Sequence, residues 1–221
     1  MTYNELRRIA AAGEGLHTEF KRKLPEWEKL IREVVAFANT EGGVVLIGVD
    51  DDGSLPGTRD PREIEEVLEL KLPTYARPAP EFTLEAIPLT RKRAVVAIHV
   101  PESRQKPHYA LSAPDAETGT VLIRIADSSA AAGREMRALL KFESRPTDIK
   151  VEFGEKERRL MQYLDDHLFI TVSDFKAAAG INSATASRTL VHLCKANVLR
   201  ILPQVEAPDR FVPVEQDFSS K

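Results

Sequence analysis

Two short runs of basic residues have the composition that contacts with phosphate require. The sequence pattern places each run on a turn or beside a strand; the runs are Lys21, Arg22 and Lys23, and Arg91, Lys92 and Arg93. Arginine and lysine side chains on protruding loops bind the phosphate oxygens of nucleic acids. Such runs are also typical of turns that are merely solvated, so both interpretations stay open.

A second set of candidate contacts lies at the start of a predicted helix near the end of the chain. Asn182 or Ser183 would cap this helix, and small polar side chains occupy its first turns. Such side chains reach phosphates and base edges, and an arginine such as Arg188 binds guanine through two hydrogen bonds. The candidate contacts are Ser183, Thr185, Ser187, Arg188, His192 and Lys195, with Arg210 on a following hairpin.

Several other chemistries lack the residues that they need. The single cysteine, Cys194, excludes an internal disulfide and most cysteine-based zinc sites. The five histidines have no metal-ligand spacing, and no G-x-x-x-x-G-K-[ST] motif is present, so we expect no ATP binding and no required cofactor. The formal net charge of −3 excludes a uniformly basic coat but allows local basic faces.

Residues 1–145 predict one α+β domain with helices on a mixed sheet. The spacing of apolar residues predicts a first helix that Thr2 caps and Gly13 ends, followed by helices at 26–39, 61–71 and 131–142. The predicted strands are at 16–21, 44–49, 81–89, 94–100 and 119–126.

Residues 155–213 predict a second, smaller domain after a polar linker at 143–154. Three helices are expected there, and two short strands follow them. This order is typical of the winged form of the helix-turn-helix. The last residues, 214–221, predict a flexible tail.

One motif makes the first domain specific. The sequence Phe-Ala-Asn-Thr-Glu-Gly-Gly at 37–43 is followed by Ile-Gly-Val-Asp-Asp at 47–51. This pattern resembles the Schlafen AlbA-2 domain family, once labelled a divergent AAA domain. The likeness covers about residues 10–142 and continues through Lys106-Pro107 and Ile123-Arg124-Ile125. The resemblance implies an α+β fold, and bacterial members that carry a winged helix are described as transcriptional regulators.

The resemblance also points to three carboxylates. Glu14, Glu19 and Asp51 fall where animal Schlafen ribonucleases carry a metal-dependent acidic triad. Three converging carboxylates would hold Mg²⁺ or Mn²⁺ and activate water to cleave a phosphodiester. Alternatively, Glu19 pairs with Lys21 or Arg22, and Asp51 lies in a solvated turn.

These observations favour a DNA-binding protein that regulates transcription. The winged helix would read duplex DNA, and the first domain would add nucleic-acid contacts or sense a signal. Two alternatives stay open: a metal-dependent endonuclease acting on RNA or DNA, and a non-enzymatic protein-interaction adaptor. We expect a homodimer on a two-fold DNA site, with RNA as a second candidate ligand. No stretch approaches the roughly 18 apolar residues of a membrane-spanning helix, so the sequence predicts a cytoplasmic protein without a membrane partner.

Overall fold

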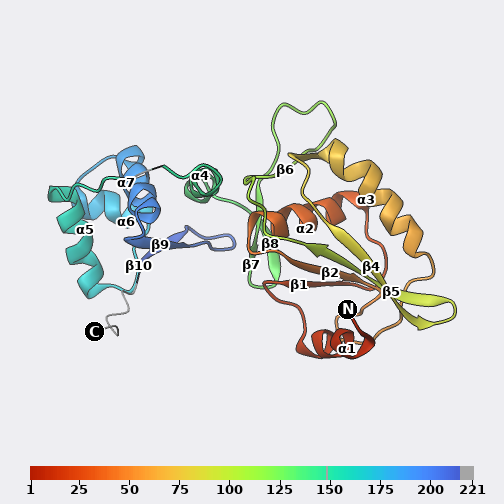
Figure 1. The fold of residues 1–221 in the computed structure, drawn as a ribbon. Coiled ribbons are helices and arrows are strands. Elements are labelled where there is room, and N and C mark those ends of the chain that lie inside the picture. The colour runs from red at the N-terminus through yellow and green to blue at the C-terminus, as the bar shows by residue number, and fades with distance from the viewer. Residues whose placement is uncertain (148, 215–221) are drawn as a thin grey trace. The chain divides into compact units, whose positions relative to one another are not determined.

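The chain folds into two compact units. The computed structural model describes residues 1–147 and 149–214 (Figure 1). The first unit runs from Met1 to Ala132, and the second begins at Gly133. Apart from Val214, the tail predicted at 214–221 lies outside the described residues.

A four-stranded mixed sheet forms the centre of the first unit. In spatial order its strands are β1 (Thr18–Lys21), β2 (Gly43–Ile47), β5 (Arg93–Val100) and β4 (Thr83–Thr90). β1 and β2 are parallel, and the other two pairs are antiparallel. The central strands β2 and β5 carry continuous apolar runs, because both of their faces are covered. The predicted mixed sheet is therefore confirmed.

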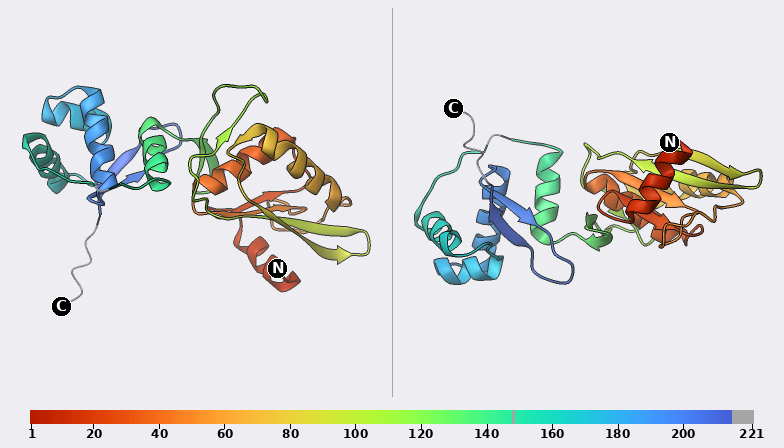
Figure 2. Two further views of the ribbon diagram at one scale, coloured as in Figure 1. Left: turned by 45° about the horizontal axis from the view of Figure 1, so that its top comes forward. Right: turned by 90° about the horizontal axis from the view of Figure 1, so that it is seen from below.

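Helices cover both faces of this sheet (Figures 1 and 2). α2 (Trp27–Asn39) and α3 (Pro61–Tyr75) pack on one face, and α1 (Tyr3–Ala12) packs on the other. Alternation along β2 divides its side chains between the two cores, since successive strand residues point to opposite faces. Val45 and Ile47 belong to the core with α2 and α3, whereas Val44 and Leu46 belong to the core with α1.

Two short strand pairs complete the first unit. β3 (Ala76–Arg77) pairs with β6 (Tyr109–Ala110), and β7 (Leu122–Ile125) pairs with β8 (Ser128–Ala131). The sequence pattern did not predict β3, β6 or β8. Strands of two residues have no alternation to detect, and β8 consists only of serine and alanine, which have little preference for strands.

The second unit contains four helices and one antiparallel strand pair among its described residues. The helices are α4 (Arg134–Glu143), α5 (Glu155–Asp166), α6 (Val172–Ala179) and α7 (Ser183–Lys195). The strand pair is β9 (Leu199–Leu202) with β10 (Arg210–Pro213). Side chains of α5, α6, α7, β9 and β10 share one core, in which Phe175 and Phe211 are the largest fully buried side chains. Among the described residues, no helix combines the length and apolar composition needed to cross a membrane.

The boundary between the units differs from the one that the sequence predicted. We expected α4 to close the first domain at residue 145, but α4 belongs to the second unit. Its Glu135 accepts a hydrogen bond from the hydroxyl of Ser187 on α7. The apolar face of an amphipathic helix predicts that the helix packs on another element but does not identify that element. The sequence pattern therefore could not assign α4 to one of the two units.

Candidate nucleic-acid interface

Arg124 on β7 is the centre of a buried ion-pair cluster in the first unit. Its guanidinium donates to Glu19 at 2.8 Å and to Glu33 at 3.1 Å. It also donates to the carbonyl of Gly15 at 2.8 Å and lies 4.8 Å from the centre of the Phe37 ring. The Arg124 side chain is 0% exposed. Two carboxylates therefore compensate the charge of a guanidinium that is buried away from water.

Glu33 on α2 is the less expected member of this cluster. Burial raises the pKa of Glu33 above its ordinary value. The hydroxyl of Ser129 donates to Glu33 at 2.6 Å and opposes that rise, while the charge of Glu19 adds to it and Arg124 opposes it. The cluster thus joins β1, α2 and the β7–β8 hairpin through charge rather than through apolar packing.

The three carboxylates of the metal-site hypothesis have different surroundings. Glu14 accepts a hydrogen bond from a backbone amide of β1 at 2.6 Å. Glu19 pairs with Arg124 and Lys21, and Asp51 is exposed in the turn after β2. Across residues 1–147 and 149–214, no group of three or more histidine, cysteine or acidic residues is placed to hold a metal ion. The pairing of Glu19 with Lys21, which was the structural alternative, is present.

The Asn-Thr-Glu-Gly-Gly part of the motif forms the corner between α2 and β2. Asn39 is fully buried; its amide donates to the carbonyls of His108 and Leu122 at 2.9 Å each and accepts from the His108 amide at 2.7 Å. A Cβ atom at Gly43 would collide with the Phe37 ring and lie 2.7 Å from a backbone oxygen. The motif therefore holds the loop around His108 against the end of α2.

Both basic runs of the first unit lie at the same end of the sheet. Lys21 pairs in register with Ile47, and Ile47 pairs with Val96, three residues after the Arg91–Arg93 run. Part of this charge is already engaged. Lys21 pairs with Glu19, and Arg22 pairs with Asp50 at 2.7 Å. Arg93 donates to the carbonyls of Pro56 and Gly57 at 2.9 Å each. Lys23, Arg91 and Lys92 are exposed.

In the second unit, α7 is capped by Asn182, one of the two caps that the sequence offered. Its side-chain oxygen accepts from the amide of Thr185 at 2.8 Å. Ser183 and Arg188 are exposed on the first two turns of α7. Arg210 is exposed at the start of β10, with its guanidinium carbon 4.3 Å from the centre of the Phe169 ring.

Three of the other predicted contacts of α7 lie against neighbouring segments of the same unit. Ser187 is buried and donates to Glu135. A ring nitrogen of His192 lies 2.9 Å from the carbonyl oxygen of Lys150, and the ammonium of Lys195 lies 5.1 Å from the centre of the Phe142 ring. The sequence pattern thus identified these side chains of α7 but not the segments that pack against them.

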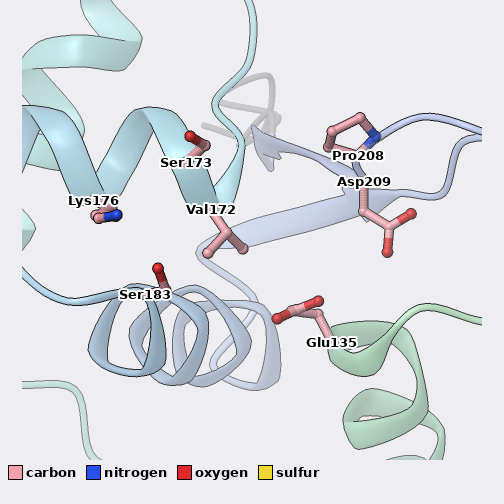
Figure 3. Close-up of a pocket in the computed structure, with 7 residues that line it drawn as sticks. All are labelled: Glu135, Val172, Ser173, Lys176, Ser183, Pro208 and Asp209. Atoms are coloured by element: carbon pink, nitrogen blue, oxygen red, sulfur yellow. The ribbon is translucent and has the colours of Figure 1, made fainter.

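A pocket of about 330 Å³ opens between α6, the start of α7, α4 and the loop before β10 (Figure 3). Its lining residues are Glu135, Val172, Ser173, Lys176, Ser183, Pro208 and Asp209. Burial raises the pKa of Asp209; the hydrogen bond from the Gln204 amide opposes this rise and the charge of Glu135 adds to it. Two carboxylates that repel each other thus lie beside α7.

Sequence reasoning missed the pairing of Arg124 and Glu33, although a signal for Arg124 existed. Arg124 is a lone charge inside the apolar run Val121–Ile125. A charge within a buried strand needs an ionic partner, so the run itself predicts that one exists. Nothing in the sequence names the partner, since Glu19 and Glu33 are separated from Arg124 by 105 and 91 positions.

Comparisons with known proteins agree with the motif. Residues 14–133 match the model of the family described as Schlafen, AlbA_2. No curated protein matches the chain. One similar solved structure is the DIP2311 protein from Corynebacterium diphtheriae, with 20% identity and a TM-score of 0.44. The match covers 69% of this chain but only 30% of that protein.

A second similar structure is the N-terminal domain of a protein from Nitrosomonas europaea that is described as related to the ATP-dependent DNA helicase RecG. It is 25% identical, with a TM-score of 0.41. The match covers 61% of this chain and 93% of that domain.

Proposed function

Since this chain belongs to the Schlafen AlbA_2 family, we propose that it is a DNA-binding protein that regulates transcription. Its second unit acts as a winged helix on duplex DNA, and its first unit adds phosphate contacts. The observation that carries the proposal is the order of elements after residue 154. Helices α5, α6 and α7 are followed directly by the antiparallel pair β9–β10, which is the order of a winged helix-turn-helix.

The α7 side chains support this assignment. In such domains the second helix of the helix-turn-helix enters the major groove with its N-terminal residues. The corresponding turns of α7 present Ser183 and Arg188, both exposed. An arginine at this place can bind guanine O6 and N7 together. Arg210 is exposed on the strand pair that would form the wing, where it would contact phosphate.

The first unit has a separate basic end. Lys23, Arg91 and Lys92 are exposed at the end of the sheet where both basic runs meet. Lysine and arginine on such turns contact phosphates without reading sequence. We assign this end of the sheet to non-specific contacts that add affinity, while α7 supplies the sequence preference.

A homodimer on a two-fold DNA site is part of the proposal. Helix-turn-helix proteins bind as pairs to half-sites about one helical turn apart. Sedimentation of the protein with a selected duplex measures this directly. Two chains per duplex are expected, and one chain per duplex would contradict the dimer.

The proposal is tested by titrating the full chain against random duplex DNA, single-stranded DNA and a tRNA pool. Gel shifts at about 50 mM and about 200 mM salt, each with and without Mn²⁺, separate the outcomes. We expect retention of duplex that weakens steeply with salt and no shortened products. Absence of duplex binding at low salt, by the full chain and by its Glu135→Ala/Phe142→Ala variant alike, would refute the proposal. Products that form only with Mn²⁺ would favour the nuclease, and stronger binding of tRNA would make RNA the ligand.

A further inference from the structure

Helix α4 lies along the face of α7 that carries Ser187, His192 and Lys195, three of the side chains that the sequence predicts to contact DNA. The Glu135 carboxylate near the start of α4 accepts from the Ser187 hydroxyl. Near the end of α4, the Phe142 ring lies under the Lys195 ammonium at 5.1 Å. Ser187 and Lys195 are eight positions apart, so α4 follows α7 for about two turns. Two contacts of different kinds, at opposite ends of α4, thus fix it to α7.

The pattern of buried residues on α7 agrees with the packing of α4 against it. Its core-facing residues include Ala186, Leu190 and Leu193, which pack with α5 and α6. Val191 is 8% exposed and lines a groove of about 290 Å³ with residues of α4, including Glu135 and Ala138. A helix that only packed on α5 and α6 would leave this second face in water.

Residues 149–150, a few positions after α4, also pack against α7. Ile149 lines the same groove as Val191. The neighbouring carbonyl of Lys150 lies 2.9 Å from a ring nitrogen of His192. Of the side chains predicted to contact DNA on α7, Ser187, His192 and Lys195 are therefore all engaged by α4 or by residues 149–150.

The negative charge on α4 also disfavours the approach of DNA phosphates to α7. Glu135 places a carboxylate at the first turns of α7, where the proposed function needs a phosphate or a base edge. Asp209 lies beside it; burial raises the pKa of Asp209, and the charge of Glu135 adds to that rise. A phosphate cannot approach two carboxylates without strong repulsion. α4 must leave before α7 can enter a groove.

We propose that α4 is an autoinhibitory helix, which covers the DNA-binding face of α7 and must be displaced for duplex binding. This inference rests on the proposed function, because it names the regulation of the same site. α4 is also the segment by which the chain passes from the first unit into the second.

The packing of α4 on α7 can be tested without DNA, by the rate at which a thiol on α7 is alkylated. In a Cys194→Ala background, Val191→Cys places a thiol under α4, whereas Ala184→Cys places one on an exposed turn of the same helix. Alkylation of the Val191→Cys thiol should be at least about tenfold slower than alkylation of the Ala184→Cys thiol. Adding Glu135→Ala and Phe142→Ala should bring the two rates within about threefold. Equal rates before those changes would overturn the inference.

Duplex binding is then compared between the full chain and the Glu135→Ala/Phe142→Ala variant. Affinity should rise by about tenfold or more, which is about 1.4 kcal/mol. Glu152→Ala is the matched control, since it removes the same charge from an exposed position outside α4, and it should change affinity by less than about twofold. An equal gain in the control would overturn the inference by reducing the effect to net charge.

The two proposals fail in different ways. If alkylation shows that α4 protects Val191→Cys and that the double substitution removes this protection, but no variant binds duplex, the proposed function fails. If the unchanged chain and the double variant bind duplex equally well, the proposed function stands and autoinhibition is refuted.

Discussion

Replacing Arg124 with methionine tests the ion-pair cluster of the first unit. Methionine keeps much of the length and apolar stem of the side chain but removes the charge. Glu33, 17% exposed in its side chain, would lose its cation, and Glu19, 9% exposed, would keep only Lys21. Removing one partner from a buried ion pair costs about 3–5 kcal/mol, since the other charge is left uncompensated.

That loss is a large part of the stability of a domain, which is about 5–15 kcal/mol. Urea unfolding at pH 7.5, followed by circular dichroism, would measure it. The matched control is Arg77→Met: Arg77 is exposed and donates to a single carbonyl at 3.1 Å. Its loss should change stability by no more than about 0.5 kcal/mol. A loss below about 1 kcal/mol for Arg124→Met would refute the assignment of the cluster.

The pH dependence gives a second, independent check. The pKa of Glu33 is raised in the folded protein, mainly by burial. A raised carboxyl pKa contributes stability below its unfolded value and loses that contribution as pH rises through the folded value. Without Arg124, which lowers this pKa, the rise becomes larger. The deficit of Arg124→Met should therefore be smaller at pH 5 than at pH 7.5, and a deficit independent of pH would contradict the argument.

Three further outcomes are expected. Asn39→Ala should cost about 3 kcal/mol in urea unfolding, because it leaves buried backbone groups of His108 and Leu122 without partners; a cost under about 1 kcal/mol would contradict this. Gly43→Ala should lower stability by about 2 kcal/mol through its collision with the Phe37 ring, whereas the same change at Gly15, where no atom lies within 4 Å of the added Cβ, should be nearly neutral. Arg188→Ala should weaken binding to a selected duplex by about 1–3 kcal/mol in fluorescence anisotropy, and an equal loss on random duplex would exclude a base contact.

Local rules were sufficient for most elements of this chain. The capping box of Thr2 and Glu5 is present, and α7 begins after Asn182, one of the two caps that the sequence offered for it. The limits of the apolar runs predicted the four strands of the central sheet to within a few residues. These features depend on neighbours within about four positions, so the sequence contains the information directly.

The candidate site was only partly accessible in this way. The basic runs and the polar turns of α7 could be recognised by residue type alone. Glu19 was recognised as chemically important, but its buried partner, Arg124, lies 105 positions away. Spacing along a chain does not determine which distant charges meet, because that depends on how the sheet, helices and hairpins pack.

The sequence by itself therefore determined the family motif and most of the elements, and it identified the side chains that we propose to contact nucleic acid. Only the tertiary structure decided that Arg124 joins Glu19 and Glu33, and that α4 packs on α7 instead of closing the first unit. The physical reason is the same in both cases. Periodicity and caps are set by backbone geometry over a few residues, whereas the partner of a buried charge or an apolar helix face is set by which surfaces the whole fold brings together.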